Sequence, residues 1–145
     1  MGVIGNRYLQ GSPILPYANV KAYPGTDLFL DLQFVDHTNT PVTPTSISIE
    51  IDDITNSNIM LSPVTLASTG STTAPLYYPA FSPTMTLQIA GSAWQMTYPY
   101  VGSQLCQVGM QFTAVDSVSN QPFTANTIIA IVELCALATV SGLSY

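Results

Sequence analysis

Residues 46–51 read Ser-Ile-Ser-Ile-Glu-Ile, with an isoleucine at every second position. Successive side chains of a β-strand point to opposite faces, so this alternation predicts a strand with one buried face. The same alternation recurs in residues 26–36, 84–89 and 105–116. A short strand is predicted over 59–66, broken or bulged at Pro63, and a last strand over 124–134.

Turn residues separate these runs, as in Asp-His-Thr-Asn-Thr-Pro at 36–41 and Asp-Ser-Val-Ser-Asn-Gln-Pro at 116–122. No helical period extends over ten residues. About seven short, regularly spaced strands with turns between them are typical of an antiparallel β-sandwich. We therefore expect an all-β protein with its sandwich domain over residues 26–134. The strand count leaves jelly-roll and immunoglobulin-like topologies equally open.

The last predicted strand carries the segment Thr-Ile-Ile-Ala-Ile-Val at 127–132. A strand that is apolar at every position is normally covered on both faces. We expect it to take a central position or to pack against a partner.

Extended arms are predicted at both ends, over residues 1–25 and 135–145. The first is apolar but interrupted by prolines, a composition unlike that of a polar disordered tail. A Ser/Thr/Gly/Pro-rich loop with exposed aromatic side chains is expected over 67–83. The candidate contact residues in these three segments are Ile14, Leu15, Tyr17, Tyr77, Tyr78, Phe81, Leu137, Val140, Leu143 and Tyr145.

Charged residues make up only 7% of the chain, whereas an average domain carries about 25%. Charge keeps a free protein soluble, so much of this surface is expected to be covered by other protein. The two basic residues, Arg7 and Lys21, and the net charge of −6 argue against binding to nucleic acid or to anionic membranes. No secretory signal is recognisable, and we expect synthesis in a cytoplasm.

Cys106 and Cys135 lie in apolar strands, and free buried thiols are expected in a reducing cytoplasm. A disulfide between neighbouring strands is the alternative.

Few residues offer catalytic or ligand-binding chemistry. His37 is the only histidine and lies in a turn, which favours a solvated turn residue over a catalytic base. Asp52-Asp53 and the oxygen-rich segment 116–120 could ligate calcium, but turn hydrogen bonding explains both more simply. Glu50 and Glu133 lie in separate strands. We expect neither an enzyme nor a cofactor, metal or small-molecule substrate.

Trp94 with Tyr98 and Tyr100 could form a platform for sugars. Aromatic residues that alternate in a sandwich belong more often to the core or to an interface.

Three stretches together resemble the small β-sandwich virion proteins of tailed bacteriophages that cement or decorate the head. They are Asp-Leu-Gln-Phe-Val-Asp at 31–36 with Thr-Pro-Val-Thr-Pro-Thr-Ser-Ile-Ser-Ile-Glu-Ile-Asp-Asp at 40–53, Met-Thr-Leu-Gln-Ile-Ala-Gly at 85–91, and Gln-Phe-Thr-Ala-Val-Asp at 111–116.

The resemblance implies a structural role on the outer face of a capsid. The partners would be the major capsid protein and further copies of this chain, and synthesis would take place in the host cytoplasm. A neck, tail or baseplate subunit and a carbohydrate-binding or adhesive module are the alternatives.

Overall fold

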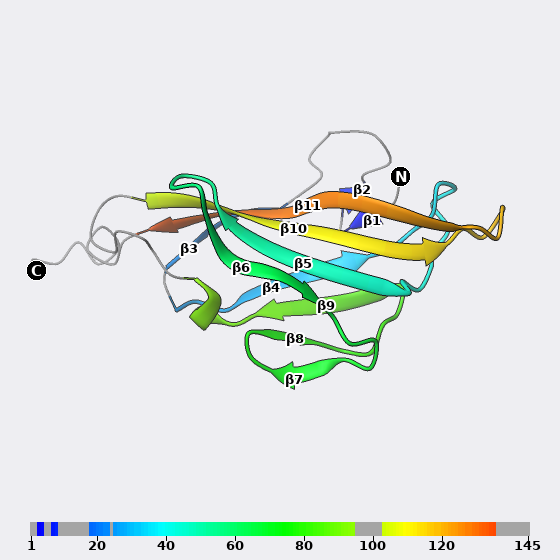
Figure 1. Ribbon diagram of the computed structural model, residues 1–145, viewed down its shortest axis with the longest axis horizontal. Helices are drawn as coiled ribbons and strands as arrows, with labels where there is room; N and C mark the ends of the chain where they lie inside the picture. Colours follow the sequence, from blue (N-terminus) through cyan, green and yellow to red (C-terminus); the bar gives the residue numbers. More distant parts are fainter. Residues whose placement is uncertain (1–2, 5–6, 9–17, 24, 95–102, 136–145) are drawn as a thin grey trace, which may run out of the picture.

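A computed structural model of the 145-residue chain describes residues 3–4, 7–8, 18–23, 25–94 and 103–135. The described residues form β-strands and turns, with one short 3-10 turn, η1 (Gly91–Ala93). Two larger sheets face each other, which is consistent with the predicted β-sandwich (Figure 1). Among the described residues, no helix has the length and apolar composition needed to cross a membrane.

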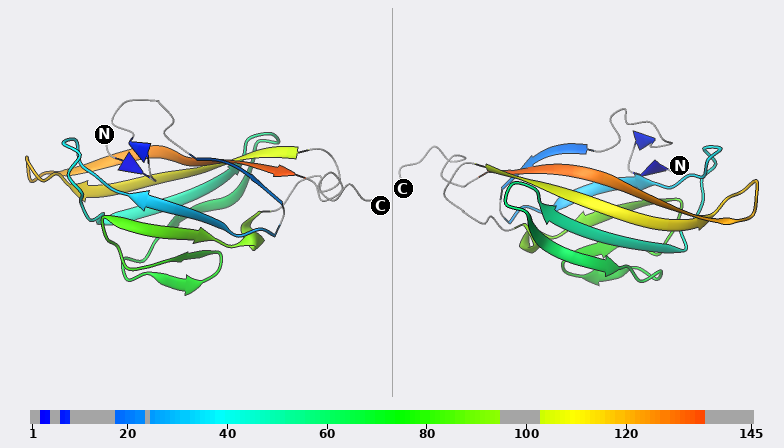
Figure 2. Two further views of the ribbon diagram at one scale, coloured as in Figure 1. Left: turned by 180° about the vertical axis from the view of Figure 1, so that it is seen from behind. Right: turned by 45° about the horizontal axis from the view of Figure 1, so that its top comes forward.

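The larger sheet has five strands in the order β3 (Ala18–Ala22), β11 (Pro122–Cys135), β10 (Ser103–Val115), β5 (Ser46–Asp53) and β6 (Asn58–Thr65). All neighbours are antiparallel except β3, which runs parallel to β11. The right-hand view of Figure 2 shows β3, in blue, beside the orange β11.

The smaller sheet has four strands in the order β4 (Leu28–Gln33), β9 (Thr84–Ile89), β8 (Leu76–Tyr78) and β7 (Ser71–Thr73), all antiparallel. A separate pair, β1 (Val3–Ile4) and β2 (Arg7–Tyr8), forms a two-stranded sheet.

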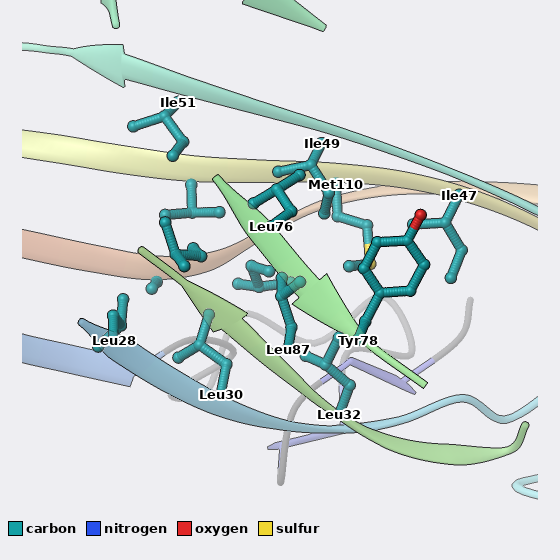
Figure 3. Packing of buried hydrophobic residues seen from close by; sticks show 14 of the residues in the cluster. Leu28, Leu30, Leu32, Ile47, Ile49, Ile51, Leu76, Tyr78, Leu87 and Met110 are labelled. Atoms are coloured by element: carbon teal, nitrogen blue, oxygen red, sulfur yellow. The ribbon is translucent and has the colours of Figure 1, made fainter. Parts of the chain in front are cut away.

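The core lies between the two larger sheets and is built by the alternating residues (Figure 3). Leu28, Leu30 and Leu32 of β4 are buried, while the residues between them are exposed. Phe112 of β10 meets the ring of Phe34 edge-on, with centroids 5.0 Å apart. Edge-to-face contact suits the quadrupoles of aromatic rings.

The alternating patterns placed most strands correctly. The predictions for 26–36, 84–89 and 105–116 are confirmed by β4, β9 and β10. The expected irregularity at Pro63 is also confirmed, because the register between β5 and β6 shifts between Ile49 and Ile51. Proline lacks the amide hydrogen that a regular ladder requires.

Two boundaries were wrong. Residues 18–22 were assigned to the N-terminal arm, but they form β3, an integral strand of the larger sheet. Residues 67–83 were predicted as one loop, but they contain the hairpin of β7 and β8. Both elements are too short to show a clear alternating pattern, so their pairing partners identify them as strands.

The run of apolar residues in β11 was expected to indicate that both faces of the strand are covered. The structure explains part of it by a bulge instead. A β-bulge shifts the register where Val108 pairs with Ala130 and Gly109 pairs with Ile128. The extra residue, Ile129, is therefore buried together with its neighbour Ala130. The expected central position is confirmed, because β11 lies between β3 and β10.

Candidate functional surfaces

The carboxylate of Asp36 joins two turns at one end of the sandwich. One of its oxygens accepts hydrogen bonds from the Thr38 amide at 2.9 Å, the Thr38 hydroxyl at 2.6 Å and the Thr40 amide at 3.1 Å. The other oxygen accepts from the amide and hydroxyl of Ser117, 81 residues further along the chain. The side chain is completely buried. Asp36 thus fixes turn 36–41 against turn 116–121.

Asp116 completes this connection from the opposite side. One oxygen accepts from the amides of Val118 and Ser119 at 3.1 and 2.9 Å, and the other contacts His37 Nδ1 at 2.5 Å. We call Asp36, His37 and Asp116 with their hydrogen-bond donors the turn clasp. The expected turn role of segment 116–120 is confirmed by these bonds. His37 is an exposed turn residue, as expected, and its ring binds Asp116.

The hydrogen bonds keep both carboxylates ionised. Burial by itself would raise the pKa of Asp36, but the bonds from Ser117 and Thr38 outweigh it and hold that pKa well below the usual value. The Ser119 amide is the largest influence on Asp116 and lowers its pKa against the opposing effect of burial, with a smaller lowering from His37.

Among the described residues, the turn clasp is a group of three side chains close enough to hold a metal ion, with ligand atoms within 4.8 Å of one another. Each carboxylate oxygen already accepts at least one hydrogen bond. A structural role in joining the two turns therefore accounts for the arrangement without an ion.

Asp52 and Asp53 point to opposite faces of β5, as the strand geometry predicted. Asp53 is buried and accepts hydrogen bonds from the amide and side chain of Asn56. Asp52 lies on the outer face with Glu50. The two aspartates do not converge on one ion.

The aromatic residues of segment 67–83 are less available than predicted. Tyr78 is buried in the core, and its hydroxyl accepts a hydrogen bond from the Ala67 amide at 2.8 Å. The prediction that Tyr78 is exposed is therefore wrong, because β8 turns this ring toward the facing sheet (Figure 3). Tyr77 and Phe81 are half-buried, and Phe81 packs against Tyr78.

Seven of the predicted contact residues lie outside the described residues. These are Ile14, Leu15 and Tyr17 near the N-terminus and Leu137, Val140, Leu143 and Tyr145 near the C-terminus. Tyr98 and Tyr100 of the possible sugar platform also lie outside them.

Trp94 is a core residue with only 1% of its surface exposed. A sugar-stacking platform needs an accessible ring face, so Trp94 cannot be part of a carbohydrate-binding surface. The indole Nε1 finds no hydrogen-bond acceptor among the described residues.

Cys106 and Cys135 are both free, as expected. Cys106 pairs with Val132 across the sheet, whereas Cys135 pairs with Ser103, so the two residues are three register positions apart. Burial raises the pKa of Cys106 to about 11 despite a hydrogen bond from Gln104.

The two glutamates occupy separate positions in the larger sheet. Glu133 of β11 faces Lys21 of β3, with the charged atoms 3.9 Å apart. Glu50 shares its face with Asp52. A hydrogen bond that protonated Glu50 donates to Asp52, together with burial and like charge, raises the pKa of Glu50.

Comparison with known proteins does not assign the chain to a family. No protein-family model matches it, and no curated protein has a significantly similar sequence.

Proposed function

We propose that this chain is a structural virion protein of a tailed bacteriophage, which cements or decorates the outer face of the head. Its partners in this role are the major capsid protein and further copies of itself. The scarcity of charge on a surface that bears exposed apolar side chains carries the proposal.

Large apolar side chains remain exposed on several parts of the fold. Phe29 on β4, Ile59 on β6 and Val118 in the turn clasp expose 62%, 62% and 66% of their surface. Single exposed apolar residues are ordinary in proteins. Here only 7% of residues are charged to balance them, which favours a surface that is covered in an assembly.

The strand order supports an immunoglobulin-like topology rather than a jelly roll. In the larger sheet, with the order β3-β11-β10-β5-β6, the edge strand β3 runs parallel to β11, the last strand of the chain. The remaining neighbouring pairs are antiparallel. The facing sheet orders β4, β9 and β8 as immunoglobulin domains order strands B, E and D. Such modules present sheet faces and end loops to partners, which suits a decorating subunit.

Deletion of the gene from the producing phage tests the cementing role. Heads without the protein should lose packaged DNA at a lower temperature or under milder chelation and osmotic shock than wild-type heads. Complementation with the intact gene is the control. Fully stable heads without the protein would contradict the cementing function.

The number of copies per virion distinguishes a head protein from a neck, tail or baseplate subunit. Quantitative mass spectrometry of purified virions should give on the order of hundreds of copies for a shell protein. About six or twelve copies would instead indicate a neck, tail or baseplate subunit.

A further inference from the structure

An open groove of about 500 Å³ crosses the outer face of the larger sheet. Its polar lining comes from Glu50 and Asp52 of β5, Gln107 and Gln111 of β10, and Asn126 of β11. This face lies opposite the core. Gln111 and Asn126 are exposed there, and Glu50, Asp52 and Gln107 are half-buried.

Gly109 makes the hollow. It lies in the middle of β10, between Glu50 of β5 and Ile128 of β11. A Cβ atom there would come no closer than 3.9 Å to the Glu50 carbonyl oxygen, so neither backbone approach nor a positive φ angle requires a glycine. The β11 bulge falls at the same register position. Bulges commonly occur where a sheet is shaped for a site.

The groove concentrates negative charge. Glu50 and Asp52 are two positions apart on β5, so both side chains point outward from the same face. The hydrogen bond with Asp52, burial and the like charge of Asp52 all raise the pKa of Glu50, as expected for two acidic groups placed side by side. No lysine or arginine lines the groove within the described chain. Lys21 lies beside Glu133 instead.

We propose that this groove receives an arginine or lysine side chain of a partner protein, held between Glu50 and Asp52 over the floor formed by Gly109. The inference deepens the proposed function, on which it rests, by naming the contact surface and the chemistry of the partner.

The lining fits a guanidinium group best. Arginine offers five N–H donors in a planar fork and binds carboxylates through paired hydrogen bonds. The side-chain carbonyls of Gln107, Gln111 and Asn126 supply further acceptors around the two carboxylates. An open groove also leaves room for the backbone of the segment that carries the side chain.

A second copy of this chain has only Arg7 and Lys21 to offer. Lys21 already faces Glu133. A partner richer in basic residues complements the net charge of −6.

Titration of the full-length, ¹⁵N-labelled protein with a short capped peptide tests the inference. The peptide carries one arginine between glycines and serines, and the control peptide replaces arginine with the uncharged isostere citrulline. Saturable amide shifts are expected at Gly109, Gln107 and Gln111 with the arginine peptide alone. Glu50→Gln and Asp52→Asn should each weaken binding at least about tenfold, because each removes one charged acceptor.

Asp31→Asn is the matched control, since Asp31 is an exposed carboxylate on the other sheet, where it accepts a hydrogen bond from Thr86. It should leave the peptide affinity unchanged. Thermal unfolding of each variant establishes that the fold is intact.

Three outcomes would overturn the inference: equal binding of the citrulline peptide, equal weakening by Asp31→Asn, or shifts at the groove caused by calcium chloride or methyl glycosides but not by the arginine peptide. If the protein is present in purified virions at shell copy number but ignores the peptide, the groove assignment fails and the proposed function stands. If it binds the peptide but is absent from virions, the proposed function fails and the groove assignment stands.

Discussion

Two carboxylates hold the turns together at one end of this molecule. Asp36 and Asp116 are buried, yet each is surrounded by hydrogen-bond donors from turns. A buried ionised group is tolerated only when such bonds replace its hydration. The donors are threonine and serine hydroxyls, the His37 ring and backbone amides, so the connection requires no lysine or arginine. This solution suits a chain with two basic residues.

Asp36→Asn should lower the thermal midpoint at pH 7, and by more than Asp31→Asn does. The folded protein lowers the pKa of Asp36 below its ordinary value of 3.8, so this contribution is complete above that pH and is lost as the pH falls toward the folded value. Thermal unfolding followed by circular dichroism at pH 7 and below pH 4 measures the difference. If the difference in thermal midpoint between wild type and Asp36→Asn stays constant over this pH range, the stabilising role of the ionised Asp36 carboxylate is contradicted.

The two cysteines should differ sharply in reactivity. Cys106 is fully buried with its pKa raised to about 11 from an ordinary 9.0, so the fraction of reactive thiolate is roughly 100-fold smaller than for an unperturbed thiol. Cys135 is only half-buried. A maleimide added to the native protein should label Cys135 alone, with Cys135→Ser as the control for specificity. Rapid labelling of Cys106 in that variant would show that the β10 end of the core opens readily.

At the scale of elements, close approaches explain which glycines matter. Gly91, in η1, packs directly against the backbone of Gly25, and a Cβ at position 91 would lie 2.1 Å from the Gly25 carbonyl oxygen. Its amide also donates to the Asp27 carboxylate at 2.7 Å. This contact ties the end of β9 to the loop before β4 in the smaller sheet.

Gly91→Ala should destabilise the protein by about 1–3 kcal/mol, as overpacking generally does. Gly109→Ala is the matched control, because its Cβ would meet nothing closer than 3.9 Å, and its stability should stay within about 0.5 kcal/mol of wild type. Chemical denaturation with urea measures both. Equal losses in the two variants would show that the cost comes from replacing glycine in general rather than from the contact with Gly25.

At the scale of the whole molecule, the scarcity of charge predicts association. The purified chain should self-associate in sedimentation velocity at micromolar concentrations, because few like charges separate its copies. Phe29→Lys and Val118→Lys should shift the distribution toward monomer, since each removes an exposed apolar side chain.

Thr84→Lys is the control for this experiment, because it adds the same charge at an exposed polar position of β9. An equally large shift in this variant would mean that net charge rather than apolar contact governs association. A wild-type chain that remains monomeric at high concentration would contradict the covered-surface interpretation.

The sequence by itself determined the all-β class and most strands. Period-two alternation is a local property, so Ile47, Ile49 and Ile51 identify the buried face of their strand whatever it pairs with. The low charge is likewise visible without any structure.

Only the tertiary structure decided the pairings between distant segments. β3 becomes a strand because β11, more than 100 residues later, supplies its hydrogen bonds, and Tyr78 is buried because the hairpin of β7 and β8 joins the smaller sheet. The turn clasp and the groove arise in the same way, from side chains that lie far apart in the chain until the strands set their register. The local pattern fixes which face of a strand is buried, but which distant strand pairs with it depends on the packing of the whole sheet.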